Sequence, residues 1–362
     1  MGTTPALHLF LGTFLVLARS KRRPEIALTS RPQTRSLLMS TPYRFIPEEA
    51  KRWKNQQGQP IAVVEVTIRT ILGIYLLKPT DQNTRLILGI LGRAKALLGF
   101  ELYGYAYLSN HGSILLGVRD ADHLARAMEY IHGNIARELG RKENSDWQGR
   151  FWGRRGRAIV VLTDEDLVRR MKYLLANSTK EGLVSHPARW PGAHCARALC
   201  DGKPDVGTWV NRTELRLLRN AARASDTQVS EADATSYYRV ELEQLPCWSH
   251  LSAEQYKQRI RSLCHDIREQ ASQERTRTGR SVLGAKRLLR LSPHHRPDGV
   301  ARSPAPPIHC RNNQLRLWFV EAYKAFVDAY KAAYGRLHQV AISGEFPPGG
   351  VPPTRVLCAL AH

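Results

Sequence analysis

The chain has 362 residues and a hydrophobic fraction of 43%, which is enough for two or three domains with a buried core. Its 54 Lys and Arg residues against 32 Asp and Glu residues give a formal net charge of +22. A charge of this size is typical of proteins that bind a polyanion, because cationic side chains displace the counterions of phosphate groups. The basic residues are spread along the whole chain, which argues against a membrane surface as the partner. A charge excess that only improves solubility stays open as an alternative.

The N-terminal residues 1–44 are predicted to form a disordered tail. An apolar run at residues 9–18 is too short to span a bilayer, which takes about 20 residues. Basic residues follow this run instead of preceding it, unlike in a signal peptide. The residues after it are rich in Arg, Ser and Thr and have no period, so Met39 is an alternative candidate for the start of the chain.

Residues 45–205 are predicted to form one domain with alternating strands and helices. Alternating and β-branched segments predict strands at 61–70, 101–108, 113–118 and 156–162, with 71–77 as a further hairpin arm. Apolar residues at helical spacing predict helices at 81–100, 120–139 and 165–177, with Asp120 and Asp164 as N-caps of the last two. This order predicts an α+β fold in which helices pack on an antiparallel sheet, close to a ferredoxin-like arrangement.

The rest of the chain differs in character from this domain. We interpret 206–235 as a polar linker, 236–345 as a small all-α domain and 346–362 as a Pro-rich tail that wraps the surface. Helices are predicted at 251–271, 281–291 and 315–337. A capping box of Ser252 and Gln255 opens the first of them. A helix-turn-helix within 251–291 is an alternative.

The last of these helices carries a stripe of four aromatic residues, Phe319, Tyr323, Phe326 and Tyr330. Their helical spacing favours a role in the core over a platform on which nucleic-acid bases stack. The six cysteines contain no Cys-x-x-Cys pair and lack the ligand spacing of zinc fingers or ribbons. We therefore expect reduced thiols and no structural zinc.

Tyr173 and Asn177 are the first candidates for chemistry. They lie four residues apart on a predicted helix, so their side chains face the same way. His111, next to a predicted strand, could share a divalent cation with Asn177, and this cation would polarise a phosphodiester that the Tyr173 hydroxyl attacks. From spacing alone, ordinary helix residues are the preferred interpretation of Tyr173 and Asn177.

Longer motifs carry a resemblance that changes this preference. The segment Tyr107-Leu108-Ser109-Asn110-His111, followed by an apolar strand, resembles the metal-binding strand of the single-tyrosine HUH transposases. This family includes the REP-associated tyrosine transposases and small insertion-sequence transposases, and its strand usually reads S/P-N-H-x-H-L-L. Four later groups of residues resemble further motifs of the family: Phe151, Trp152, Arg154, Arg155, Arg157 and Ala158; Tyr173, Leu174 and Asn177; Lys180, Gly182, Leu183 and Val184; Trp190 and Pro191.

The resemblance covers about residues 45–200, and residues 280–355 are similar to the extra C-terminal region of a long subgroup. It implies that Tyr173 is the nucleophile of a DNA transposase and forms a 5′-phosphotyrosine link. His111 and Asn177 would be the metal ligands, and Mg²⁺ or Mn²⁺ the cofactor, since hard cations suit phosphate oxygens. Four cationic residues would contact DNA phosphates: Arg154, Arg155, Arg157 and Lys180.

The same resemblance implies single-stranded DNA, often with a hairpin, as the substrate. It also implies a cytoplasmic, nucleoid-associated bacterial protein with a homodimer as one expected state and no membrane partner.

Two positions depart from the family pattern. Ser113 stands where the family has its second histidine, and a neutral hydroxyl is a poorer metal ligand than imidazole. We expect this loss to weaken metal affinity by about 10–100-fold or more. Gly112 replaces a bulky apolar residue, which is expected to loosen the strand. The sequence thus leaves two main functions open, a single-tyrosine DNA strand transferase and a catalytically impaired relative that binds hairpin or repeat DNA without cutting it. RNA binding is a third alternative.

Overall fold

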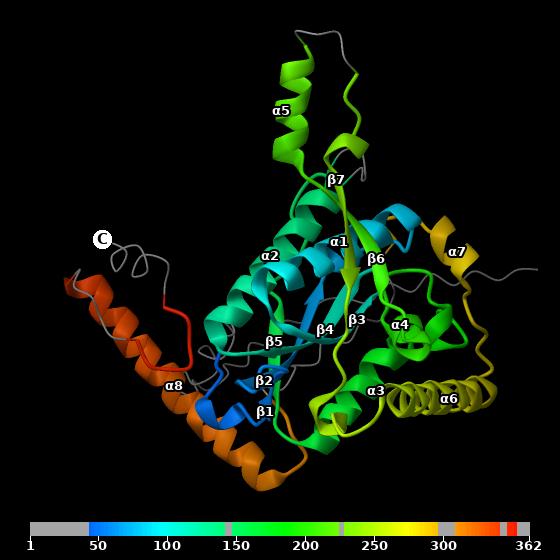
Figure 1. Ribbon diagram of the computed structural model, residues 1–362. Helices are drawn as coiled ribbons and strands as arrows, with labels where there is room; N and C mark the ends of the chain where they lie inside the picture. The colour runs from blue at the N-terminus through cyan, green and yellow to red at the C-terminus, as the bar shows by residue number, and fades with distance from the viewer. Residues whose placement is uncertain (1–42, 142–146, 224–227, 296–307, 341–345, 353–362) are drawn as a thin grey trace, which may run out of the picture. The chain divides into compact units, whose positions relative to one another are not determined.

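Four antiparallel strands form the centre of the fold in a ferredoxin-like order (Figure 1). The computed structural model describes residues 43–141, 147–223, 228–295, 308–340 and 346–352, with the backbone only for 337–340. The strands are β2 (Pro60–Arg69), β3 (Glu101–Tyr107), β4 (His111–Val118) and β5 (Arg157–Val161), in the order β3-β4-β2-β5. The predicted α+β class and the antiparallel ferredoxin-like core are confirmed.

Two short strands extend this sheet. β1 (Trp53–Lys54) pairs with β2, and β8 (Ile308–His309) pairs with β5 in the parallel direction. The sheet is therefore mixed at one edge, where the C-terminal part of the chain adds the parallel strand. Strand β8 could not be predicted, because two residues are too few to establish an alternating pattern.

Helices α1 (Asp81–Leu98) and α2 (Ala121–Leu139) bury apolar residues in the main core with β2 and β4. The side chain of Thr80 caps α1, and Gly99 ends it in the left-handed conformation with a φ of 68°. The predicted N-cap Asp120 is confirmed, because its Oδ1 accepts a hydrogen bond of 2.7 Å from the backbone N–H of His123.

Helix α3 (Asp164–Lys180) packs on the sheet through Met171 and Leu174, both within 3.4 Å of a Cβ atom built at Gly104. The predicted cap of this helix is wrong by one residue. Thr163 is the N-cap, and its Oγ1 accepts a hydrogen bond of 3.2 Å from the N–H of Asp166. The Asp164 carboxylate instead accepts a hydrogen bond of 2.9 Å from the indole N–H of Trp53. The local sequence favoured Asp164 as the cap, but its side chain bonds Trp53 of β1 instead.

The hairpin arm predicted at 71–77 is absent. Residues Ile71–Gly73 form a 3₁₀ turn, in which Leu72 has a φ of 53°. Backbone hydrogen bonds hold this segment against the turn between β3 and β4: the N–H of Thr70 donates to Asn110 O at 2.9 Å, and that of Leu77 donates to Ser109 O at 2.8 Å. These bonds satisfy the backbone groups that a hairpin would have paired.

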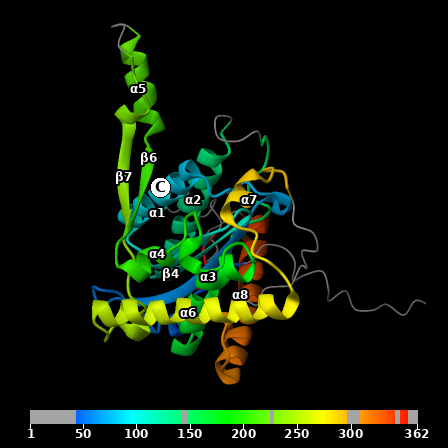
Figure 2. The ribbon, with the colours of Figure 1, turned by 90° about the vertical axis from the view of Figure 1, so that its right-hand side faces the viewer.

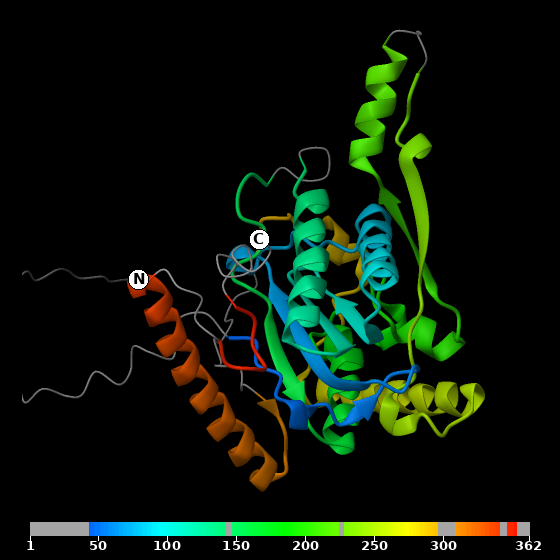
Figure 3. The ribbon, with the colours of Figure 1, turned by 60° about the vertical axis from the view of Figure 1, so that its left-hand side comes forward.

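The segment interpreted as a linker contains regular structure instead. β6 (Asp205–Val210) and β7 (Thr235–Val240) form a two-stranded antiparallel ribbon, and α5 (Arg212–Ala222) lies between them in the chain. The ribbon packs closely on α1, where Gly207 and Gly89 approach so tightly that neither position has room for a Cβ atom. Figures 1 and 3 show α5 extending beyond α1 and α2.

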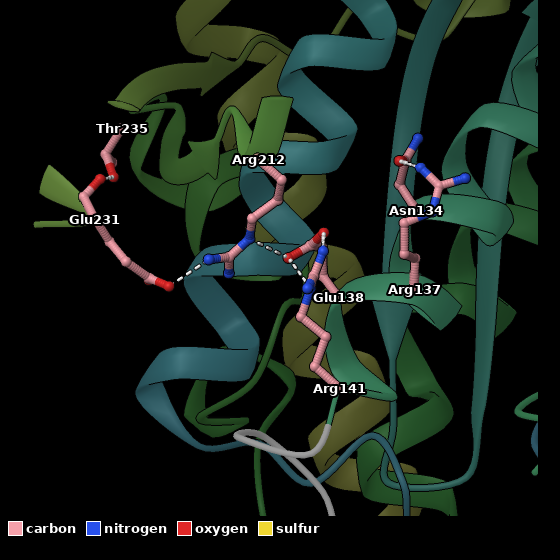
Figure 4. A network of polar contacts seen from close by, with 7 residues as sticks. All are labelled: Asn134, Arg137, Glu138, Arg141, Arg212, Glu231 and Thr235. Atoms are coloured by element: carbon pink, nitrogen blue, oxygen red, sulfur yellow. Dashed lines mark hydrogen bonds and ion pairs between the residues drawn. The ribbon is translucent and has the colours of Figure 1, made fainter. Parts of the chain in front are cut away.

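A polar network ties this ribbon to α2 (Figure 4). The buried Glu138 carboxylate accepts hydrogen bonds from Arg141 at 3.1 Å and from Arg212, the first residue of α5, at 3.2 Å. Arg212 also pairs with Glu231, whose backbone carbonyl accepts a hydrogen bond of 2.6 Å from Thr235 Oγ1. Polar composition suggested a linker here, but these charges form an anchored structural contact.

The C-terminal helices are α4 (Ala196–Asp201), α6 (Ala253–Thr278), α7 (Ala285–Arg290) and α8 (Asn313–Val340), and 3₁₀ turns occupy Glu48–Ala50, Pro187–Arg189, Ala232–Ala234 and Pro246–Trp248. Helices α4, α6 and α8 bury side chains in the same core as the sheet, and α7 buries Leu288 in a smaller cluster. Helix α6 runs beside α3 and α4, as Figure 2 shows. Its buried residues and Phe319 of α8 join the main hydrophobic cluster. A separate core for 236–345 is therefore not present among the described residues.

The local predictions for this region hold better. The capping box is confirmed, with reciprocal hydrogen bonds of 2.9 and 3.2 Å between Ser252 and Gln255. The aromatic stripe of α8 packs as core, because Phe319 and Phe326 are buried and the ring of Phe45 lies 4.6 Å from that of Phe326. Helix α7 has only six residues, so the chain lacks a helix-turn-helix in 251–291.

The ends of the chain fall mostly outside the described residues. Of the tail predicted at 1–44, only Tyr43 and Arg44 are described, and Tyr43 packs on Tyr330 of α8 with ring centroids 4.8 Å apart. Residues 346–352 of the Pro-rich tail lie against the N-terminal segment and α8, where the N–H of Ile46 donates to Gly349 O at 2.9 Å. Among the helices that the structure describes, none is long and apolar enough to cross a membrane.

Candidate active site

The two faces of β2 differ in polarity, and the candidate site lies on the polar one. Val64, Val66 and Ile68 alternate with Glu65, Thr67 and Arg69 along this strand. Residues paired across neighbouring strands share a face, and Thr67 is paired with Ser113 and Arg69 with His111. Gly104 of β3 and Glu65 are both paired with Leu115, so Gly104 lies on the same face as Glu65. Met171 and Leu174 of α3 contact Gly104, so α3 packs against this face.

Tyr173 is exposed on α3 between two cations. Its side chain is 39% exposed, and its ring lies 4.2 Å from the Arg170 guanidinium carbon and 4.7 Å from Lys180 Nζ. Arg170 and Lys180 are three residues before and seven after Tyr173, which places all three on one side of the helix. Both cations therefore place positive charge beside the Tyr173 ring, and Arg170 shares its charge with the carboxylate of Glu65 in β2.

His111 is the first residue of β4, and Asn110 fixes its ring. The Asn110 Nδ2 group donates to Gly73 O at 3.1 Å, which turns the amide so that Oδ1 lies 2.8 Å from His111 Nδ1. An amide oxygen can only accept, so Nδ1 carries the imidazole proton and Nε2 keeps its lone pair. Burial, together with the charges of Arg69 and Lys180, lowers the pKa of His111 to about 4, so the ring is neutral at physiological pH.

Asn177 and Ser113 are both buried near this face. The Asn177 side chain is 4% exposed, and its Nδ2 has no hydrogen-bond partner among the described residues, although buried amides are nearly always bonded. Ser113 is 2% exposed and lies in the row of Thr67. The sequence prediction that Tyr173 and Asn177 share one helix holds. Helix α3 contacts β4, and the charge of Lys180, the last residue of α3, acts on His111.

These donors fit a resident divalent cation poorly. The set consists of one imidazole, one amide and one hydroxyl, whereas Mg²⁺ sites rely on carboxylate oxygens. The charges that act on His111 are those of Arg69 and Lys180, both positive. Across the described residues, no three His, Cys, Asp or Glu side chains group closely enough to hold a metal ion. The side chains of Arg69 and Lys180 thus supply positive charge near His111, where a bound metal ion would otherwise supply it.

Gly112 does not loosen the strand as expected. A Cβ atom at this position would lie 2.5 Å from Cε1 of Tyr107, whose ring is fully buried beside it. The Tyr107 ring thus fills the space that a bulky apolar residue would occupy. The small residue at Gly112 is compensated by the large Tyr107 on the neighbouring strand. This compensation is not visible when the motif of one strand is compared alone.

A buried ion cluster underlies Arg170, and sequence reasoning missed it. The Glu65 carboxylate pairs with Arg170 at 2.6 Å and with Nε2 of His309, from β8, at 2.9 Å. Burial by itself would raise the pKa of Glu65, but the hydrogen bonds from His309 and Arg170 outweigh it and lower that pKa. The helical spacing from Tyr173 would have identified Arg170, whereas nothing in the sequence links His309 to β2.

The predicted DNA-contacting residues are divided between two places. Lys180 lies at the Tyr173 ring. Arg154 and Arg155 are exposed before β5, and the charge of Arg155 acts on Arg44 near α8. Arg157 is partly buried, and burial followed by the charge of Arg154 lowers its pKa. Lys180 therefore lies next to Tyr173, whereas Arg155 lies near Arg44.

Comparisons with known proteins add only distant likenesses. No protein-family pattern and no curated protein match the chain. A solved structure of a REP-associated tyrosine transposase bound to a REP hairpin is similar with a TM-score of 0.33 and 16% identity, over 40% of this chain and 82% of that one. A protein of Deinococcus radiodurans R1 described as a transposase is similar with a TM-score of 0.26 and 15% identity, over 33% of this chain and 94% of that one. At these values neither likeness supports an inference about this chain.

Proposed function

We propose that this protein is a DNA strand transferase of the single-tyrosine type, acting on single-stranded DNA that carries a hairpin. The observation that supports it most is the exposed Tyr173 ring between Arg170 and Lys180. The motif resemblance over residues 45–200 supports the same assignment independently. A tyrosine held against two cations on a protein with a formal charge of +22 suits a phosphodiester substrate.

In the proposed reaction the Tyr173 hydroxyl oxygen attacks the phosphorus atom of a phosphodiester. A bond forms between the tyrosine oxygen and phosphorus, and the bond from phosphorus to the 3′ oxygen breaks. The tyrosine proton leaves and the 3′ oxygen gains a proton, so the products are a 5′-phosphotyrosine and a free 3′ hydroxyl. Arg170 and Lys180 would bind the phosphate oxygens, and strand transfer is the reverse attack by another 3′ hydroxyl.

The expected Mg²⁺ or Mn²⁺ ion stays a prediction that the donor set does not favour. No step of the proposed reaction is assigned to it. A metal test applies to the neutral His111 and to Asn177, whose Nδ2 lacks a hydrogen-bond partner in the described part of the chain. Ser113→His restores the ligand type of the family that the motifs resemble.

A second candidate function is binding of hairpin or repeat DNA without cutting. The observation that favours it is the buried Ser113 in the position of the second histidine. The proposed DNA contacts at Arg154, Arg155, Arg157 and Lys180 would serve either function. A nucleoid location and a homodimer belong to this proposal as well, and light scattering of the purified protein tests the dimer.

The deciding experiment uses a single-stranded hairpin oligonucleotide labelled at its 3′ end, because a 5′-phosphotyrosine link retains that fragment. The protein is incubated with it in buffer containing Mn²⁺ and in buffer containing a chelator, then run on a denaturing gel. A covalent adduct in the wild type that disappears in Tyr173→Phe supports the transferase. An adduct only in Ser113→His supports the binding relative with a degraded site. An adduct that persists in Tyr173→Phe contradicts the nucleophile assignment.

A further inference from the structure

A basic segment after α6 packs directly against the turns that frame Tyr173. We call residues 279–295, which contain α7, the α7 strap. The N–H groups of Leu283 and Gly284 donate to the carbonyls of Gly182 and Leu183 at 2.9 and 3.1 Å, in the turn that follows α3. The strap is thereby fixed next to the end of the helix that carries Tyr173.

The other end of the strap is held by the loop between β2 and α1. The N–H of Tyr75 donates to Pro293 O at 2.7 Å, and Lys78 Nζ donates to Leu291 O at 2.8 Å. This loop also contacts the site, because Gly73 O accepts a hydrogen bond of 3.1 Å from Asn110 Nδ2, and Asn110 Oδ1 bonds His111 Nδ1 at 2.8 Å. Both ends of the strap are therefore tied to elements that carry candidate site residues.

An apolar anchor fixes which side of α7 faces outward. Leu288 is 1% exposed and is buried with Tyr75, Leu108, Val184 and Trp190. Leu108 in turn bonds the start of β4, where its N–H donates to His111 O at 2.8 Å. With Leu288 turned inward, the charged residues of this short helix face solvent.

The exposed side of the strap carries positive charge alone. Arg280, Lys286, Arg287 and Arg290 are exposed, and residues 279–295 contain no Asp or Glu. Within the part of the chain that the structure describes, Lys286, Arg287 and Arg290 make no ion pair, whereas Arg268 and Arg277 on α6 each pair with a neighbouring Glu at 2.8 and 2.6 Å. Unpaired arginines next to one another repel, so a cluster of them favours an anionic partner.

We propose that the α7 strap binds the phosphates of the DNA strand on one side of the phosphodiester held at Tyr173. This inference rests on the proposed function and adds a contact surface outside the motifs of residues 45–200. Lys286 and Arg290 are one helical turn apart, and Arg287 and Arg290 are three residues apart, so the three cations form one continuous surface. Phosphate contacts of this kind fix the register of the strand without reading its sequence.

The test compares two triple variants that remove the same charge. The first is Lys286→Gln, Arg287→Gln and Arg290→Gln in the strap. The control is Arg216→Gln, Arg219→Gln and Arg223→Gln, three exposed arginines of which two lie on α5 and Arg223 follows its last residue. Binding of a fluorescent single-stranded hairpin DNA is measured by anisotropy between about 50 mM and 200 mM salt. Melting temperatures equal to that of the wild type establish that both variants fold.

The proposal predicts that the strap variant loses about tenfold or more in affinity. It also predicts that the slope of log affinity against log salt becomes shallower by about 2, since each phosphate contact on a single strand contributes about 0.7. The α5 variant should change affinity by less than about threefold. Equal losses in both variants would mean that net charge alone is measured, and would overturn the proposal.

Further outcomes separate this proposal from the proposed function. Unchanged binding in the strap variant, with a wild type that binds DNA and forms the Tyr173 adduct, overturns the strap alone. A wild type that binds no hairpin DNA contradicts the proposed function and the strap together. Tighter binding of an RNA hairpin of the same sequence, lost in the strap variant, overturns DNA as the partner.

Discussion

The two faces of the second half of β2 differ in chemistry. On one face, Val64 and Val66 belong to the main hydrophobic cluster, and Ile68 is buried. On the other face, Glu65, Thr67 and Arg69 lie in rows with Ser113 and His111. A sheet covered by helices on both faces is usually apolar on both. Buried polar groups that stability alone does not require are instead typical of functional sites.

Breaking the apolar face should have the largest effect. Val66→Asp places a carboxylate at a buried position that is paired with Ile114 and Ala158. We expect a loss of about 4 kcal/mol or more in the free energy of unfolding, or no soluble protein. Thr67→Val, on the adjacent residue and the opposite face, removes at most one hydrogen bond of a half-buried hydroxyl and should cost less than about 1.5 kcal/mol. Urea denaturation of both variants measures this contrast, and equal losses would contradict the division into two faces.

Removing one partner from the ion cluster of the polar face should have the next largest effect. Arg170→Ala removes the arginine that pairs with the buried Glu65 carboxylate and leaves the His309 imidazole as its neighbour. We expect a loss of about 3 kcal/mol, because an uncompensated buried charge costs more than the pair contributes. The double variant Glu65→Leu and Arg170→Met should recover most of this stability. A double variant as unstable as Arg170→Ala would show that packing, and not the charge, is responsible.

The fit between Gly112 and Tyr107 gives a third, smaller effect. Gly112→Val forces side-chain atoms into the Tyr107 ring, and we expect a cost of about 2–3 kcal/mol. Adding Tyr107→Ala to Gly112→Val should return part of the loss, because the two residues compete for one space. Thermal unfolding of the single and double variants tests this coupling. Additive losses would mean that the two positions are independent.

Acid should destabilise the protein through a buried histidine on each side of the sheet. Burial lowers the pKa of His132, on α2, to about 3 and that of His194, beside β3, to about 4. Unfolding frees these rings to take up protons near pH 6.5, so stability is lost as the pH falls below that value. For each ring we expect about 1 kcal/mol less stability at pH 5.5 than at pH 7. His132→Gln and His194→Gln should each flatten the pH profile, and an unchanged profile would contradict the prediction.

Elements with a strong local pattern could be predicted from the sequence. The strands and helices of the ferredoxin-like core, the Asp120 cap and the Ser252 capping box all depend on residues close in the chain. The placement of Tyr173 and Asn177 on one helix also follows from the local pattern. These features need no knowledge of distant contacts.

The remaining features depend on contacts between distant residues, which one sequence does not reveal. Trp53 takes Asp164 away from the helix cap, and Glu138 anchors an arginine in a segment that looked like a linker. Tyr107 fills the space above Gly112, and His309 reaches Glu65 from more than two hundred residues away. For the same reason, the positive surroundings of His111 became visible only once β2 and α3 were placed around it.

Mass spectrometry of the intact protein after incubation with the hairpin oligonucleotide tests the central claim most directly. Tyr173, on the helix that covers the polar face and next to Arg170 and Lys180, is proposed to attack DNA. The account predicts a species heavier by the mass of the downstream DNA fragment, with the modification mapped to Tyr173 and absent in Tyr173→Phe. No such species in the wild type or in Ser113→His, under conditions where both bind the hairpin, would contradict it.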